Sequence, residues 1–282
     1  MKHFFELTKP RITFFILMST AVGFVFGAHM GQPWTWITLL HTLLGTFLIA
    51  SGTAALNQWY EREGDALMRR TERRPIPSGR VTARDALVFG AALSAAGFAE
   101  LSLGVNLLTG LLALFTLASY LFVYTPLKRR SPISTTVGAI PGAMPPLIGY
   151  AAASGHLNFE AGILFAILFL WQFPHFYAIA WMYREDYARA GIRMLPVVEP
   201  TVDSTARRIL WFSLALVPMS LMPSFFAMAG NVYTFGAAVL GILVLYAGYQ
   251  ANAVRTMAHA RRVLLASIVY LPLLYGLLAF DS

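Results

Sequence analysis

The chain contains no cysteine among its 282 residues. That absence excludes a disulfide framework, a thiolate metal site and a catalytic thiol. Charged side chains are also scarce, because they make up 12% of the residues, about half the share found in a soluble domain. The sequence has no GxSxG motif, no HExxH motif and no glycine-rich phosphate loop. These absences argue against the common soluble hydrolase, metalloprotease and nucleotide-binding classes.

Hydrophobic residues make up 57% of the chain and occur in blocks of about 18–25, the length that spans a bilayer as a helix. We therefore predict an all-α polytopic membrane protein, with one domain over residues 1–282 and nine transmembrane helices in a single bundle. The first block is too long for a signal peptide, and further spans follow it. The helices are expected at about 12–28, 35–58, 85–103, 107–124, 134–153, 159–182, 208–227, 232–250 and 263–280.

Positive charge is absent from alternate loops of this predicted bundle. All 21 Lys and Arg residues lie before the first helix or after an even-numbered helix. The loops at 29–34, 104–106, 154–158 and 228–231 contain none. The positive-inside rule then places the N-terminus in the cytoplasm and the C-terminus outside. The net charge of +8 is thus mainly a topology signal, Lys9 included, and we expect no nucleic-acid partner.

A polar triplet lies at the inner end of the second predicted helix. Asn57, Glu61 and Asp65 are spaced i, i+4, i+8, which on a helix puts three oxygen ligands on one face over roughly 12 Å. Hard oxygen ligands suit Mg²⁺, which bridges carboxylates to phosphate, and the arginines within 69–74 suit phosphate as well. The alternative is an ordinary helix end solvated among headgroups. Small apolar residues before Asn57 favour close packing, so we predict that the triplet faces a polar cavity at the cytoplasmic side.

A second polar group interrupts the sixth predicted helix. Gln172 and His175 flank Pro174, which removes a backbone hydrogen bond and is expected to kink or open the helix. Glu185 and Asp186 follow two or three turns later and are candidates for a second ligand set facing the first. His175 can alternatively serve only as a hydrogen bond between helices.

Two further segments carry candidate residues. Tyr124 and Lys128 are spaced i, i+4 at a helix exit, where both can point to an anion, although an interfacial tyrosine and a topogenic lysine would look the same. Three prolines within 141–146 predict a broken helix, which membranes tolerate where it lines a cavity. His41 and Glu100, in the outer halves of their helices, are candidates for contact with a polar substrate.

At these residues the chain resembles the haem-prenylating branch of the UbiA-type family of membrane prenyltransferases, over nearly its whole length. The segment from Trp171 to His175 is the specific part, since it separates this branch from relatives that prenylate quinone precursors. The motifs that carry the resemblance are Thr8-Lys9-Pro10-Arg11, Asn57-x3-Glu61-x3-Asp65, Arg70-Thr71, Arg73-Arg74-Pro75, Tyr124-Thr125-x2-Lys128-Arg129, Gly138-Ala139-x-Pro141-Gly142-Ala143-x-Pro145-Pro146, Trp171-Gln172-x-Pro174-His175-Phe176, Asp186-Tyr187 and Met194-Leu195-Pro196.

The resemblance implies a reaction and its partners. Farnesyl diphosphate and haem b combine, with addition of water at a haem vinyl group, to give haem o and diphosphate. It also implies a multi-pass protein of the bacterial inner membrane and Mg²⁺ as cofactor, and it makes a downstream haem-handling enzyme a candidate partner. The residues implied are Asn57, Glu61, Asp65 and Asp186 for Mg²⁺; Lys128, Arg70, Arg74 and Arg193 for the diphosphate; Tyr124, Tyr177 and Trp181 for the allylic cation; and Gln172, His175 and His41 for the haem.

Two alternatives remain at this point. The same diphosphate site would serve a prenyltransferase acting on an aromatic quinone precursor, because only the acceptor pocket differs. A transporter would also line broken helices with charge. Transport is disfavoured because the polar residues gather on one side and leave the outer half without a polar route.

Overall fold

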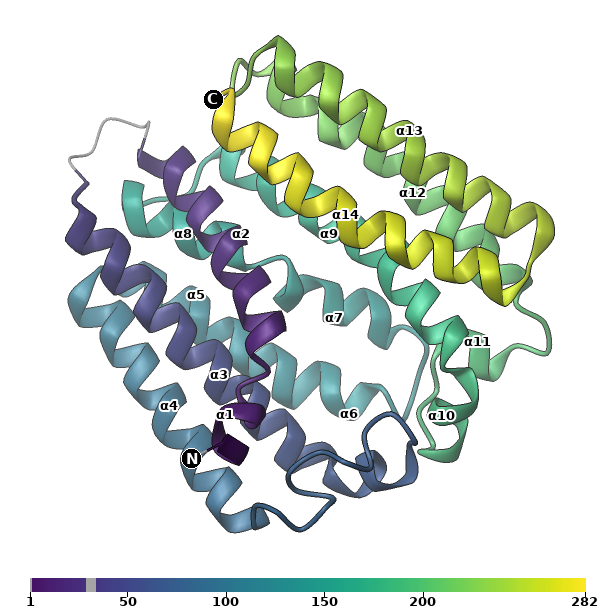
Figure 1. The fold of residues 1–282 in the computed structure, drawn as a ribbon. Helices are drawn as coiled ribbons and strands as arrows, with labels where there is room; N and C mark the ends of the chain where they lie inside the picture. Colours follow the sequence, from purple (N-terminus) through teal and green to yellow (C-terminus); the bar gives the residue numbers. More distant parts are fainter. Residues whose placement is uncertain (1, 29–33) are drawn as a thin grey trace.

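The computed structural model describes residues 2–28 and 34–282, and this part of the chain contains helices and no strand (Figure 1). The elements in chain order are α1 (Lys2–Leu7), α2 (Pro10–Ala28), α3 (Trp36–Leu67), α4 (Ala83–Gly104), α5 (Leu107–Ala118), the π-helix η1 (Ser119–Tyr124), α6 (Thr125–Leu127), α7 (Ser134–Gly142), α8 (Pro145–Ser154), α9 (Phe159–Met182), α10 (Arg184–Arg189), α11 (Leu195–Val198), α12 (Asp203–Phe225), α13 (Asn231–Val254) and α14 (Met257–Phe280).

Eight of the nine predicted spans are helices long and apolar enough to cross a membrane. The ninth, predicted at 134–153, is broken into α7 and α8, as its prolines indicated. One boundary differs in a way that matters for function. The helix predicted to end at residue 58 continues to Leu67, so the whole polar triplet lies on α3. The α9 helix runs from Phe159 to Met182, the range predicted from the sequence, with Pro174 inside it.

The helices form two groups that meet along α2, α8 and α9 (Figure 1). In the first group α3 packs on α4 and α2 packs on α8; in the second, α12 packs on α9 and α13, and α14 on α9 and α13. The contact between α2 and α8 depends on small residues, since a Cβ on Gly149 would overlap the Thr20 carbonyl oxygen and one on Gly23 would overlap that of Pro146. Close approach at glycines is how membrane helices gain packing energy in the absence of a hydrophobic drive between them.

A π-helical turn ends the span that begins at α5. The backbone N–H and the hydroxyl of Thr125 both bond to the carbonyl of Tyr120, the hydroxyl at 2.8 Å. Pro126 follows and has no N–H to continue the ordinary α pattern. Single π turns of this kind often re-aim side chains at functional sites. Here the turn presents Tyr124 and, one turn later, Lys128.

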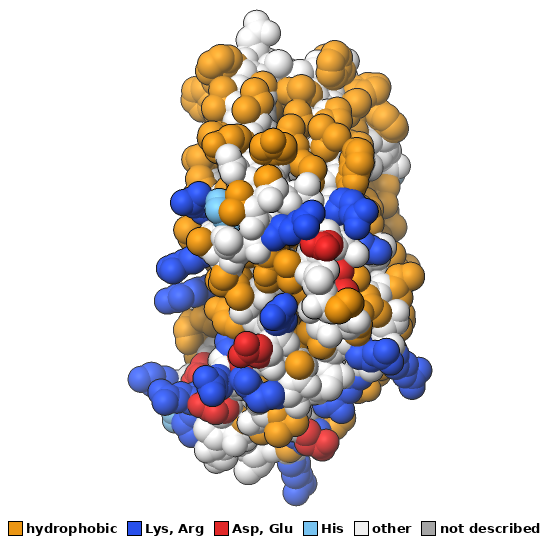
Figure 2. Space-filling model, turned by 90° about the vertical axis from the view of Figure 1, so that its right-hand side faces the viewer, with side chains coloured by type: hydrophobic (Ala, Val, Ile, Leu, Met, Phe, Trp, Pro, Cys, Tyr) orange, Lys and Arg blue, Asp and Glu red, His pale blue; other side chains and the backbone are white. Residues whose placement is uncertain are grey.

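Charged side chains gather at one end of the bundle, while hydrophobic side chains cover the other end (Figure 2). Large apolar side chains on the outer helix faces are widely exposed; Leu103 is 88% and Phe280 81% accessible. Such exposure is expected where lipid, rather than water, is the solvent. The structure is therefore that of an integral multi-pass membrane protein with its polar chemistry at one end.

Candidate functional site

The polar triplet of α3 forms a hydrogen-bonded face at the charged end of the bundle. Asn57 and Asp65 are each 1% exposed. The side-chain amide of Asn57 donates to Glu61 Oε2 at 2.9 Å, so the two residues one turn apart face each other. Thr71, in the loop after α3, donates its hydroxyl to the Asp65 carbonyl at 2.8 Å and holds the end of the helix. All three residues thus lie on α3, at the spacing that puts them on one face of a helix.

Each of these oxygen groups is bound to a basic side chain. Lys9 Nζ donates to Asn57 Oδ1 at 3.0 Å, and Lys128 Nζ to Glu61 Oε1 at 2.9 Å. The guanidinium of Arg74 lies 2.6 Å from Asp65 Oδ2. Buried carboxylates require such partners, because an unpaired charge away from water is costly.

Asp186 on α10 is joined to the same end of α3. Its Oδ2 accepts the backbone N–H of Arg70 at 3.3 Å, and its other oxygen pairs with Arg189. The Arg70 guanidinium lies 5.2 Å above the ring of Tyr183, and it donates to the Tyr187 hydroxyl at 3.4 Å. The structure therefore places the second acidic motif against the loop that follows the first. We call Asn57, Glu61, Asp65 and Asp186 the oxygen-donor set.

Lys128 and Lys9 differ in charge state. Burial opposes the charged form of Lys128, but the adjacent Glu61 carboxylate outweighs it and holds the pKa of Lys128 well above its ordinary value. Burial, with the positive charge of Arg74, lowers the pKa of Lys9 to about 7. Lys128 is therefore a fixed cation at neutral pH, whereas the lowered pKa of Lys9 leaves its amine partly neutral there.

Two tyrosines lie beneath the fixed cation. Lys128 Nζ is 4.4 Å from the ring centroid of Tyr124 and 5.9 Å from that of Tyr120. The two rings are 5.0 Å apart, and Gly138 of α7 packs so tightly against Tyr124 that a Cβ would lie 2.5 Å from the ring. Aromatic faces next to a cation site also suit a carbocation.

The donor chemistry of the set fits Mg²⁺, because amide and carboxylate oxygens are the ligands that this hard cation takes. Among the described residues, however, no three Asp, Glu or His side chains lie close enough together to hold a metal ion as they stand. The reason is visible in the ion pairs, since each donor is turned toward a basic partner. Those same basic groups are the ones that a diphosphate would attract. Groups of the kind that bind a metal ion and groups of the kind that bind a diphosphate are thus both present, paired with one another.

A separate polar group lies deeper in the bundle, on α9 and α14. His175 Nδ1 is 2.9 Å from Ser267 Oγ, and its ring stacks on Trp171 with centroids 4.7 Å apart. Gln172 donates to the Ala139 carbonyl of α7 at 2.9 Å. Its amide oxygen leaves no room for a Cβ at Gly142, which explains why glycine stands where α7 ends. The predicted residues of the sixth helix therefore connect α9 with both α7 and α14.

Several predicted site residues lie elsewhere. His41 pairs through Nδ1 with Glu100 at 2.6 Å, toward the opposite end of α3 and about 24 Å from Asn57 by helical rise. Tyr177 and Trp181 are 1% and 3% exposed within an apolar cluster of α9, α12 and α14, where Arg208 donates to the Tyr177 hydroxyl at 3.1 Å. Arg193, by contrast, lies next to Lys128: its side chain is exposed, and its backbone N–H bonds to the Lys128 carbonyl at 2.7 Å.

The sequence interpretation missed Lys9, Tyr120, Arg189 and Ser267. Lys9 was assigned to topology, although it stands in a recognised motif before a proline. In the structure it adopts φ +48°, which turns the chain from α1 into α2, and Gln58 anchors the preceding Leu7 carbonyl at 2.8 Å. Tyr120 and Arg189 follow from spacing, one turn from Tyr124 and from Asp186. Ser267 had no local signal, since its partner is 92 residues away.

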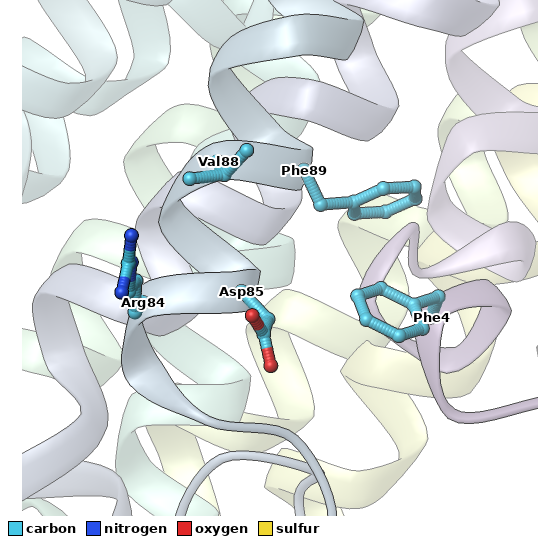
Figure 3. A pocket seen from close by; sticks show the side chains of 5 residues that line it. All are labelled: Phe4, Arg84, Asp85, Val88 and Phe89. Atoms are coloured by element: carbon cyan, nitrogen blue, oxygen red, sulfur yellow. The ribbon is translucent and has the colours of Figure 1, made fainter.

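A shallow surface hollow lies apart from these residues. It lies between α1 and α4 and is lined by Phe4, Arg84, Asp85, Val88 and Phe89 (Figure 3). The rings of Phe4 and Phe89 meet edge to face at 5.1 Å and close one wall. None of the predicted site residues lines this hollow, so we regard it as part of the packing between the N-terminal helix and α4.

Comparison with known proteins gives the chain a family. The profile of the UbiA prenyltransferase family matches residues 16–274. A protoheme IX farnesyltransferase from Solibacter usitatus is 61% identical over 288 aligned residues, which cover all of this chain and 99% of that protein. In fold, the chain is similar to a solved digeranylgeranylglyceryl phosphate synthase, with a TM-score of 0.82 and 18% identity. That match covers 99% of this chain and 97% of the synthase. It is also similar to a UbiA homologue from Archaeoglobus fulgidus bound to GPP and Mg²⁺, with a TM-score of 0.67 and 16% identity. That match covers 98% of this chain and 99% of the homologue. The chain belongs to the UbiA prenyltransferase family.

Proposed function

We propose that this protein transfers a farnesyl group from farnesyl diphosphate to a vinyl group of haem b, with addition of water, giving haem o and diphosphate. The pairing of every member of the oxygen-donor set with a basic side chain carries the proposal, because it puts both halves of a metal–diphosphate site in contact. The identity of the acceptor is supported by the relative from Solibacter usitatus, which is named protoheme IX farnesyltransferase and matches over the full chain.

The oxygen-donor set is proposed to hold Mg²⁺. Bound there, the ion would neutralise charge that develops on the leaving diphosphate. Support comes from the chemistry of the donors and from the family member whose structure is described as bound to GPP and Mg²⁺. Lys128, Arg70, Arg74 and Arg193 are proposed to bind the diphosphate oxygens, with Lys9 added to them on the strength of its bond to Asn57.

The departure of diphosphate breaks the allylic C–O bond and leaves a farnesyl cation. Tyr124 and Tyr120 are proposed to face that cation, since their rings already lie under the Lys128 ammonium. The haem vinyl group attacks the allylic carbon and forms the new C–C bond. Water then adds to the resulting cation beside the macrocycle and loses a proton, which gives the hydroxyethylfarnesyl group.

His175, with Gln172 beside it, is proposed to belong to the acceptor side. The imidazole lies about 10 Å from the inner end of α9 by helical rise, and its Nδ1 is already bonded. Imidazole nitrogen is a common ligand of haem iron. Of the two histidines implicated by resemblance, we favour His175 for the iron, because His41 pairs with Glu100 near the other end of α3.

The orientation in the membrane is also a proposal. The charged end carries the basic loops, which supports a cytoplasmic active site, a cytoplasmic N-terminus and an external C-terminus in a bacterial inner membrane. Farnesyl diphosphate would then bring its anionic head from the cytoplasmic side while its tail lies among apolar helices.

The acceptor is tested by competition. Purified protein with Mg²⁺ and farnesyl diphosphate is offered haem b and 4-hydroxybenzoate together, and products are separated and weighed by mass spectrometry. We expect haem o and no prenylated benzoate. Prenylated benzoate without haem o would contradict the proposal and favour the quinone-precursor alternative.

A further inference from the structure

We infer that Ser267 is a positioning residue which fixes His175 in the tautomer that carries its proton on Nδ1 and leaves the lone pair of Nε2 for the iron of haem b. The identity of the ligand rests on the proposed function. The tautomer itself rests only on hydrogen bonds between α9 and α14.

The direction of each bond follows from the serine hydroxyl. Ser267 Oγ donates its single proton to the Leu264 carbonyl at 2.7 Å. That proton is not available for His175, whose Nδ1 is 2.9 Å from the same oxygen. The serine oxygen must therefore accept, and Nδ1 must be the donor. In a neutral imidazole one nitrogen donates and the other carries the lone pair, so the lone pair lies on Nε2.

The imidazole is also fixed in orientation. Trp171, one turn before His175, stacks on it with ring planes 23° apart. The Trp171 indole N–H donates to the backbone carbonyl of Ser267 at 2.8 Å, so one residue of α14 holds both rings. Rotating the imidazole by half a turn would exchange a nitrogen for a carbon at Ser267 and lose the bond.

The free nitrogen has no competing partner within residues 2–28 and 34–282. The hydrogen bond of His175 there is the one through Nδ1, and no carboxylate pairs with the ring. The side chain is partly accessible rather than sealed in the core. A neutral imidazole that is oriented through one nitrogen and has no protein partner at the other is the arrangement that metal-binding histidines use, because the bond at the first nitrogen fixes the ring and raises its basicity.

The test is a titration of the purified full-length protein with haem b, followed by optical absorption and without farnesyl diphosphate. Loss of an orienting partner typically weakens metal binding about 10–100-fold. We therefore expect Ser267→Ala to weaken haem binding in that range and to shift the Soret band. Ser267→Thr keeps a hydroxyl and should restore both. His175→Ala should lose the histidine-ligated spectrum.

Ser19→Ala is the matched control, since Ser19 is likewise a buried serine whose hydroxyl donates to a carbonyl of its own helix, that of Phe15 at 2.9 Å, rather than to a histidine. It should leave haem affinity and spectrum unchanged. Should Ser267→Ala fail to fold, Ser267→Cys provides a similar volume with a weak acceptor and is expected to weaken binding as well. Wild-type affinity and spectrum in Ser267→Ala or Ser267→Cys would overturn the inference. Histidine-ligated haem in a wild-type protein that makes no haem o would instead sink the proposed function and leave this inference standing.

Discussion

Two polar sites in this bundle, the oxygen-donor set at the charged end and the His175–Ser267 pair deeper in α9 and α14, are built from different kinds of interaction. The first consists of ion pairs, such as Lys128 with Glu61 at 2.9 Å. The second consists of neutral hydrogen bonds and a stacked ring. Charge is tolerated at the membrane surface because water and headgroups are near, whereas groups deeper in the membrane are less costly when they are neutral and hydrogen-bonded. We therefore propose a division of labour between a diphosphate end, which contains the oxygen-donor set, and an acceptor end, which contains His175.

The largest effect is expected from Asp65→Asn, which removes a charge from the ionic site. The asparagine amide has nearly the shape of the aspartate but carries no negative charge, so it binds Mg²⁺ more weakly beside the diphosphate. Turnover should therefore fall by about 10³-fold or more. Initial rates of haem o formation measure this. Asp85→Asn is the control, because Asp85 is an exposed carboxylate at the start of α4. Full activity in folded Asp65→Asn would remove Asp65 from the proposed metal site.

A smaller loss is expected from Lys128→Met, which keeps the length of the side chain and removes its charge. One electrostatic contact to the leaving group is typically worth about 10²–10³-fold in rate. Lys128→Arg should recover part of it, and Arg130→Gln, a neighbouring exposed cation, should have little effect. If Lys128→Met and Arg130→Gln reduce kcat/KM equally, the loop supplies only general positive charge.

How far the sequence could predict these sites depends on the distance between partners. Helix geometry fixes residues one turn apart, so the triplet on α3 was predictable from its spacing. A helix predicted from hydropathy ends where the apolar run ends. For this reason α3 was expected to end at residue 58, although its backbone hydrogen bonds continue to Leu67. Two partners of the triplet are distant in the sequence. Lys9 is 48 residues from Asn57 and Lys128 is 67 residues from Glu61, so only tertiary packing brings them together.

Binding of Mg²⁺ should depend on diphosphate, because the donor set is closed by its own cations until an anion draws them away. Coupling between two ligands typically amounts to roughly 5–150-fold in affinity. Calorimetric titration with Mg²⁺, with and without a non-hydrolysable farnesyl diphosphate analogue, measures it. Lys9→Met should reduce the coupling by opening Asn57 in the free protein. Equal Mg²⁺ affinities in the two titrations would mean that the ion pairs do not gate the site.

The smallest effect is expected from His41→Ala. Its partner is Glu100, and the pair lies about 24 Å along α3 from Asn57, outside both sites. Substitutions away from functional groups usually change free energies by less than about 0.5 kcal/mol, which corresponds to roughly a factor of two in an affinity or a rate. Haem affinity and haem o formation should stay within that factor. A loss of the histidine-ligated spectrum in His41→Ala would mean that His41, in the outer half of α3, and not His175 ligates the haem iron.

The division of labour is tested most directly by measuring two ligands separately in two variants. Binding of Mg²⁺ with the farnesyl diphosphate analogue, and binding of haem b, are each titrated in Asp65→Asn and in His175→Ala. We predict that Asp65→Asn loses the first and keeps the second, and that His175→Ala does the reverse. Loss of both ligands in either variant, with the fold intact, would contradict two separate sites.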